Sequence, residues 1–238
     1  MILRWLPATA ALALTGCMID GSGPESSNPP RHEFRAIDHE KLERLKVHLK
    51  MGAGDLQAAG GTEKLMAADF TYGKPSMKPE VRYNAIHGEG DLSIEQPSEN
   101  GAHIAGTKRY EWDIRLARDV PMDLSMQFGA GKAQLDLGSL DLNSVEIEMG
   151  VGDLTLDLRG QPKHDYTVRI RGGVGQATVR LSADTGVTAE VQGGIGSIEA
   201  PGLIRHGNHI ENEALGKSKA TIHLDVQGGI GAIKLLTD

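Results

Sequence analysis

The chain is poor in cysteines, aromatic residues and long apolar runs, and each shortage argues against a class of protein. A single cysteine among 238 residues excludes an internal disulfide and any zinc site built from several cysteines. Phe, Trp and Tyr together supply only 9 residues, so a core anchored on aromatic side chains is not expected. The net charge of -7 argues against a nucleic-acid partner, because neutralising phosphates requires a basic face.

Glycine is abundant instead, with 31 residues, about 13% of the chain against an average near 7%. Many glycines form Gly-x-Gly pairs, whose first members lie 36, 41, 21, 23, 21 and 35 residues apart. A repeat of this length is typical of stacked units that cannot bury their apolar face alone. Because glycine accepts unusual dihedral angles and close neighbours, we interpret the pairs as structural corners. The expected corner residues are Gly52, Gly54, Gly88, Gly90, Gly129, Gly131, Gly150, Gly152, Gly173, Gly175, Gly194, Gly196, Gly229 and Gly231.

The N-terminus is typical of a secreted, lipid-anchored protein. Residues 1–16 combine an early arginine with a short apolar run that is too short to span a bilayer, so they are interpreted as a signal peptide. The run ends in Leu-Thr-Gly-Cys, which resembles a bacterial lipobox and implies lipid attachment at Cys17. Residues 17–32 are rich in Gly, Ser and Pro and predict a flexible tether, followed by one folded domain at 33–238. The expected location is the cell envelope, with the outer membrane facing the periplasm favoured and the cell surface as the alternative.

Apolar residues alternate on both sides of the glycine pairs, as in strands with one buried face. We therefore predict an all-β parallel, right-handed β-helix of about seven coils with inserts. Residues 129–149 suggest three short strands per coil, with further corners at Gly138-Ser139 and Asn143-Ser144. The last coil, ending at residues 233–236, is expected to leave an open sheet edge. An antiparallel β-sandwich is the alternative, although it does not require a repeated glycine register.

A longer pattern of motifs runs through about residues 40–238. It comprises Gly60-Gly61, Lys64-Leu65, Phe70-Thr71-Tyr72, Lys78-Pro79-Glu80-Val81, Tyr83, Trp112-Asp113-Ile114-Arg115-Leu116, Val120-Pro121, Leu124, Gly129-Ala130-Gly131 and Leu135-Asp136-Leu137. This pattern resembles the bacterial toast-rack proteins. The resemblance implies an extracytoplasmic β-helical module, similar to domains linked to envelope stress and cell-wall-active antibiotics and to predicted adhesin heads. It carries over no catalytic residue, and the lipid anchor departs from the transmembrane helices of the stress-response proteins.

Polar residues follow most glycine pairs and are the strongest candidates for chemistry. The position three residues after each first glycine holds Asp55, Asp91, Lys132, Asp153, Gln176, Ser197 and Ala232. Stacked carboxylates would suit calcium or, with the lysine, a polysaccharide lyase. Because Asp and Ser also bind nearby backbone amides, solvated turn residues are the simpler interpretation. His206 and His209 are interpreted as part of a solvated loop, and no metal or cofactor is predicted.

The sequence thus favours a non-enzymatic, lipid-anchored binding or scaffold module whose partner is a protein or an envelope glycan. Two alternatives stay open: an envelope carbohydrate-active lyase or hydrolase that uses the polar column, and a surface adhesin.

Overall fold

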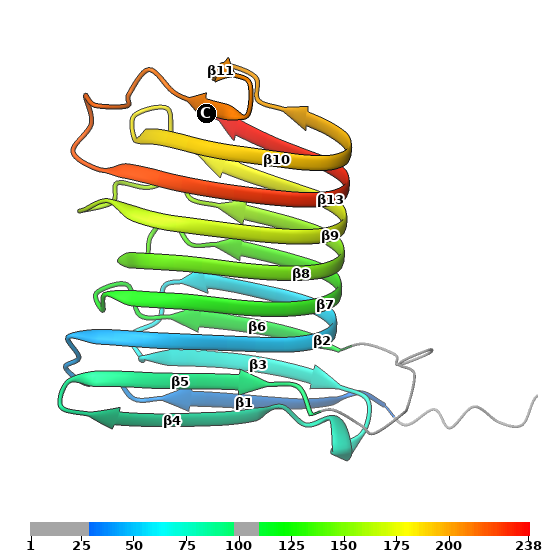
Figure 1. The fold of residues 1–238 in the computed structure, drawn as a ribbon. Helices are drawn as coiled ribbons and strands as arrows, with labels where there is room; N and C mark the ends of the chain where they lie inside the picture. Colours follow the sequence, from blue (N-terminus) through cyan, green and yellow to red (C-terminus); the bar gives the residue numbers. More distant parts are fainter. Residues whose placement is uncertain (1–28, 98–109) are drawn as a thin grey trace, which may run out of the picture.

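The computed structural model describes residues 29–97 and 110–238, which are all-β (Figure 1). Thirteen strands form one mixed, mostly parallel sheet, and the one helix in these ranges is a 3₁₀ turn at Pro75–Met77. Within the same ranges no helix has the length and apolar character to cross a bilayer. The strands are β1 (Arg31–Ile37), β2 (Arg44–Gly60), β3 (Met66–Tyr72), β4 (Glu80–Ile86), β5 (Glu89–Glu95), β6 (Glu111–Leu116), β7 (Met122–Asp136), β8 (Leu142–Asp157), β9 (Tyr166–Leu181), β10 (Gly186–Glu199), β11 (Ile204–His206), β12 (His209–Glu211) and β13 (Thr221–Thr237).

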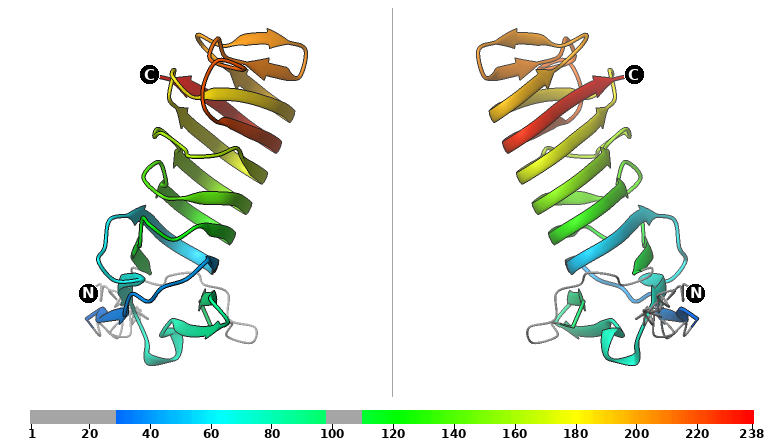
Figure 2. Two further views of the ribbon diagram at one scale, coloured as in Figure 1. Left: turned by 90° about the vertical axis from the view of Figure 1, so that its left-hand side faces the viewer. Right: turned by 90° about the vertical axis from the view of Figure 1, so that its right-hand side faces the viewer.

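Six long strands of 14 to 17 residues form the body of the protein. They lie parallel in the order β2, β7, β8, β9, β13, β10. Each strand runs along one face, bends, and returns along the opposite face (Figures 1 and 2). The sheet therefore folds over on itself, and parallel pairing among the long strands excludes the antiparallel sandwich for the described residues.

The apolar core lies between the two faces of the folded sheet. In β7, Leu124 and Met126 are 1% exposed, whereas Gln127 faces solvent. Phe128 before the bend and Ala133 after it are both buried, although they are five positions apart. Simple alternation would place Ala133 outside. The bend thus resets the alternation, so that both halves of each long strand direct their apolar residues into one core.

Several of the few aromatic residues gather at the N-terminal end of the sheet. Trp112 of β6 is 1% exposed, and its ring meets that of Phe70 of β3 edge to face, with 5.7 Å between centroids. Tyr110 lies against the same indole, and its hydroxyl donates to the carbonyl of Met77 at 2.9 Å. Large rings therefore fill this end of the core, where short strands replace a full bent strand.

Short strands complete the N-terminal end. The first half of β2, Arg44–Lys50, pairs in parallel with β5, and its second half, Asp55–Gly60, pairs with β6. Strand β3 is antiparallel to β6 and to β1, and β4 is antiparallel to β5. Strand β1 begins at Arg31, two residues before the predicted start of the folded domain. Cys17 and the predicted signal peptide lie outside the described residues.

The C-terminal strand does not lie at the end of the sheet, so the predicted open edge after residue 236 is wrong. Strand β13 is inserted between β9 and β10 and pairs in parallel with both along its length. Beyond β10, the antiparallel strands β12 and β11 cover part of the exposed edge. The residues that cover this part of the edge come from the last insert rather than from the end of the chain.

The predicted three strands per coil are also wrong. The corner expected at Asn143-Ser144 lies inside β8, where Asn143 is an extra residue opposite β7: Met122 pairs with Leu142, and Asp123 pairs with Ser144. This irregularity lets Ser144 donate to the Asp123 carboxylate at 2.7 Å. Each repeat therefore consists of one bent strand and one turn, such as the turn that contains Gly138.

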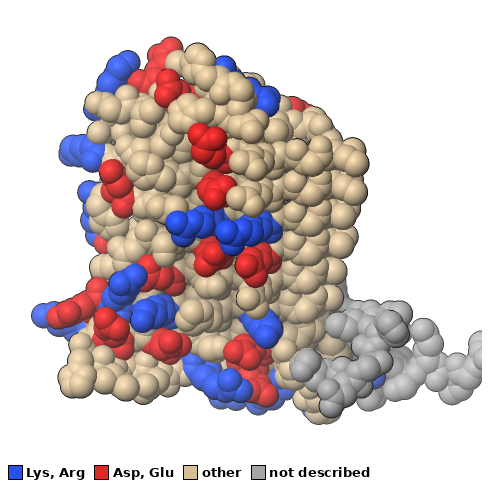
Figure 3. Space-filling model, viewed as in Figure 1, with Lys and Arg blue, Asp and Glu red and all other residues tan. Residues whose placement is uncertain are grey.

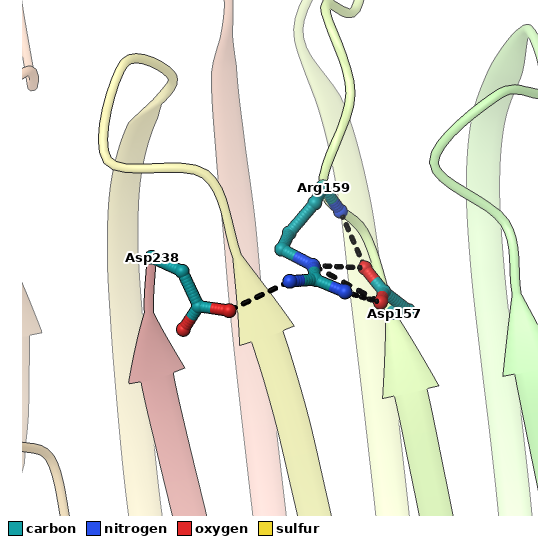
Figure 4. A network of polar contacts seen from close by, with 3 residues as sticks. All are labelled: Asp157, Arg159 and Asp238. Carbon is teal, nitrogen blue, oxygen red and sulfur yellow. Dashed lines mark hydrogen bonds and ion pairs between the residues drawn. The ribbon is translucent and has the colours of Figure 1, made fainter.

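An ion-pair network ties the chain end to the turn after β8 (Figure 4). Arg159 donates to Asp157 at 2.6 Å and, through its other terminal nitrogen, to Asp238 at 2.6 Å. Burial opposes ionisation of Asp157, but the hydrogen bonds from the Arg159 side chain and backbone outweigh it and lower the pKa of that carboxyl. The contact crosses the end of β9 and joins Asp238 to the turn after β8.

Candidate binding surfaces

Six Gly-x-Gly bends stack directly on one another at one side of the sheet. The second glycine of each bend has a positive φ between 128° and 148°. Successive members lie in register on neighbouring strands. Along the sheet they are Gly54, Gly131, Gly152, Gly175, Gly231 and Gly196.

Steric crowding explains why this column is glycine. A Cβ on Gly131 would lie 2.0 Å from the carbonyl oxygen of Gly54, and one on Gly152 would lie 1.9 Å from that of Gly131. The first glycines are crowded as well, since a Cβ on Gly150 would lie 2.4 Å from the Gly129 oxygen. The bends therefore combine a backbone conformation and a strand spacing that only glycine allows.

Gly88 and Gly90 do not belong to this column, which corrects the expected seventh corner. Strands β4 and β5 form an antiparallel hairpin in which Ile86 pairs with Glu89, so His87 and Gly88 are its two-residue turn. Both turn residues have positive φ, 52° and 84°, as this kind of tight hairpin requires. Gly90 pairs with Leu45 in the first half of β2, far along the strand from the Gly52 bend.

The polar column is only partly assembled. Asp55, Lys132 and Asp153 are in register on β2, β7 and β8, followed by Gln176, Ala232 and Ser197. Asp91 instead pairs with Lys46 and Asn84 on the other half of the folded sheet. The three charged members are exposed and alternate in sign. Within the described ranges, no group of three His, Asp or Glu residues is arranged to hold a metal ion.

The two neighbouring histidines face each other across the β11–β12 hairpin. His206 pairs with His209 and is exposed. His209 Nδ1 lies 2.8 Å from the Glu190 carboxylate and Nε2 lies 3.6 Å from that of Glu211. The hydrogen bond to Glu190 raises the pKa of His209. These contacts attach the hairpin to β10.

A polar groove with a volume of about 610 Å³ lies on the outer face of β4, β5, β2 and β7. Strand pairing places Arg82, Ser93, His48 and Ser125 in one row across it. Glu95, Lys50 and Gln127 form the next row. The full lining is His48, Leu49, Lys50, Arg82, Tyr83, Asn84, Asp91, Ser93, Glu95, Ser125 and Gln127.

The groove offers hydrogen-bond donors and acceptors of both charges. Ser93 donates to Glu95 at 3.0 Å, and His48 lies 4.0 Å from Asp91. The exposed ammonium group of Lys50 makes no hydrogen bond or ion pair with any residue in the described part of the chain. The groove is not apparent from the sequence, because its residues come from four strands that are far apart along the chain.

Comparisons with known proteins agree with this architecture. Residues 26–180 match the family described as the N-terminal domain of toast_rack, DUF2154. A structure described as a "putative cell adhesion protein" from Clostridium sporogenes is 32% identical, with a TM-score of 0.82, over 88% of this chain and 100% of that one. A "putative adhesin" from Bacteroides fragilis is 11% identical, with a TM-score of 0.33, over 88% of this chain and 98% of that one. No curated protein matches the chain.

Proposed function

Because the chain belongs to the toast_rack family, we propose that it is a non-enzymatic binding module of the cell envelope, held at a membrane by lipid on Cys17. The observation that carries the proposal is the polar groove, which lies on a rigid sheet and presents hydroxyl, amide, cationic and carboxylate groups together. Such a surface suits a hydroxyl-rich envelope glycan, which offers both donors and acceptors. An envelope protein is the alternative partner.

The arrangement of the acidic residues supports binding over catalysis. A lyase site would require its carboxylates and base to converge on one substrate atom. Asp91 lies in the groove, whereas Asp55, Lys132 and Asp153 form an exposed row on the other half of the sheet. The carbohydrate-active alternative therefore lacks the cluster of carboxylates and base that it requires.

The folded sheet supports a solenoid interpretation. Each bent strand and the turn after it form one coil, and we propose that the coils are right-handed, as nearly all connections between parallel strands are. Such a scaffold holds the groove residues in fixed rows, because every row is set by strand pairing.

Groove variants test the proposed binding. The doubly substituted chain with Lys50→Ala and Ser93→Ala is expected to bind purified peptidoglycan or cell-wall polysaccharide about tenfold more weakly, a loss of about 1.4 kcal/mol. The matched control carries Lys132→Ala and Ser197→Ala, which remove the same residue types outside the groove. Sedimentation of the purified full-length chain with the insoluble glycan measures the affinity. Equal affinity of the two variants refutes a glycan-binding groove, and release of soluble sugar fragments refutes a non-enzymatic role.

Replacement of Cys17 tests the lipid anchor. Cys17→Ala is expected to move the protein from the membrane fraction to the soluble fraction, because no acyl chains would remain to bind the bilayer. Immunoblotting of fractionated cells measures the distribution, with the wild-type chain as control. A variant that stays with the membranes contradicts lipid attachment, whatever the groove binds.

A surface adhesin is the second candidate, favoured by the 32% identical protein whose description refers to cell adhesion. It requires the domain to face the outside of the cell. Protease treatment of intact cells is expected to digest a surface-exposed chain and to leave a periplasmic one intact, which separates this candidate from the first.

A further inference from the structure

The middle residues of the six Gly-x-Gly bends form one exposed apolar row, here called the ridge. Along the sheet it consists of Ala53, Ala130, Val151, Val174, Ile230 and Ile195. The four larger side chains are 54%, 44%, 53% and 73% exposed in that order. The bend itself does not require them, because alanine occupies the same position in β2 and β7.

The ridge stands clear of its surroundings. A glycine lies on each side of every ridge residue, so no neighbouring side chain in the bend covers it. On the face seen in Figure 3, the visible part of the edge where the long strands bend is free of Lys, Arg, Asp and Glu. The row spans about 24 Å at the usual spacing of strands. It exposes on the order of 400 Å² of apolar surface, a size that often marks an interaction site.

Side-chain size increases steadily along the ridge. Two alanines are followed by two valines and then by two isoleucines. When two copies of this row meet in opposite directions, Ala53 faces Ile195, Ala130 faces Ile230 and Val151 faces Val174. Each pair then has nearly the same combined size. We propose that the ridge binds a second copy of this chain, with the two ridges antiparallel about a two-fold axis that lies across them.

The charges beside the ridge favour the same direction. Glu148 and Arg171 lie three residues before Val151 and Val174 on neighbouring strands, and their charged groups are 3.9 Å apart within one copy. In the antiparallel pair, Glu148 of each copy faces Arg171 of the other. A parallel pair would instead bring Glu148 against Asp153 of the other copy. Opposite charges therefore meet in the antiparallel arrangement, and like charges meet in the parallel one.

The interface is small. With the glycines included, it would bury on the order of 1,000 Å² in total, which is at the lower end of specific interfaces. The dimer is therefore weak and forms at high local concentration. Two paired copies would present two grooves, which increases the avidity for a repeating partner.

Disulfide crosslinking of the full-length chain tests the pairing. The double variant Ala53→Cys with Ile195→Cys should give several-fold more covalent dimer under mild oxidation than either single variant, because only it brings two cysteines together across the axis. Wild type, whose one cysteine is Cys17, gives the background level of covalent dimer. Adding Val151→Glu and Val174→Glu to the double variant should abolish the excess dimer, because carboxylates would then face one another at the centre of the interface.

Other outcomes overturn the proposal. If Ala53→Cys alone crosslinks strongly, the two ridges are parallel. If the double variant gives no more covalent dimer than wild type, the ridges do not pair. If that double variant stays monomeric and a fluorophore on Ile195→Cys shifts to the blue with vesicles of phosphatidylethanolamine and phosphatidylglycerol, the ridge binds lipid instead. Because these readouts need no glycan, they are independent of the groove experiment.

Discussion

Replacing Gly175 by alanine is expected to unfold the domain or to destabilise it by more than about 4 kcal/mol, whereas the same replacement at Gly172 leaves it stable. The two glycines belong to the same bend of β9 and lie three residues apart. The added methyl group is identical in both variants. The comparison therefore isolates the position of the Cβ atom from the change in residue type.

Two effects act together at Gly175. Its φ of 138° lies in a region that residues with a side chain rarely adopt, and the new Cβ would lie 1.8 Å from the carbonyl oxygen of Gly152. That oxygen belongs to the backbone of β8, which is itself paired on both sides. The neighbour cannot move away without breaking the register of the stack. Strain at Gly175 therefore spreads to adjacent strands.

Gly172 has space for the added methyl group. A Cβ there meets no atom within 4 Å, and the residue lines an apolar cavity of about 30 Å³ together with Ile170 and Ile233. Gly172→Ala is expected to be neutral or to stabilise by up to about 1 kcal/mol, since it also restricts the unfolded chain. Chemical denaturation followed by circular dichroism measures both variants. Similar unfolding midpoints would refute steric crowding as the reason for the glycine column.

Asn212→Leu is expected to destabilise the C-terminal end by about 2–5 kcal/mol, because two buried backbone groups would lose their partners. Asn212 is 7% exposed and follows β12. Its side chain donates to the Thr185 carbonyl at 2.7 Å and accepts from the Val187 amide at 2.9 Å. These bonds attach the β11–β12 hairpin to the start of β10. Leucine has a similar size but can neither donate nor accept.

Asn208→Leu is the matched control, because Asn208 is exposed and only its backbone carbonyl is bonded, to Val191. The control should unfold within about 0.5 kcal/mol of wild type, as surface substitutions usually do. Limited proteolysis should cleave the hairpin of the Asn212 variant faster and leave the N-terminal strands protected. Equal stability and equal cleavage of the two variants would mean that Asn212 does not hold the hairpin in place.

The bends were predictable from sequence because a steric requirement dictates a residue type. Where Gly131 lies against Gly54 and Gly152, any side chain collides with backbone, and the chain repeats glycine at each such point. The corner predicted at Gly88 and Gly90 was wrong, because Gly-x-Gly also occurs where a tight hairpin turn is followed by a crowded strand residue. Two alternating runs separated by only His87-Gly88 were the signal of a hairpin.

The strand order and the groove were not predictable from sequence. The bends of β9, β13 and β10 share the pattern Gly-Gly-apolar-Gly, so nothing local shows that β13 lies between the other two. The groove depends on rows such as Arg82, Ser93 and His48, whose members meet only through pairing across strands. Sequence periodicity reports which face a residue occupies. It does not report which strand lies beside it.

The position of β13 also constrains the order in which the strands of the sheet can pair. Strands β9 and β10 precede β13 in the sequence, yet they become neighbours of β13 and not of each other. The space between them, about one strand wide, is filled by the 17 residues of β13. A chain cut short before Thr221 would keep two unpaired edges, which readily capture strands from other molecules. Insertion of β13 thus completes the parallel stack.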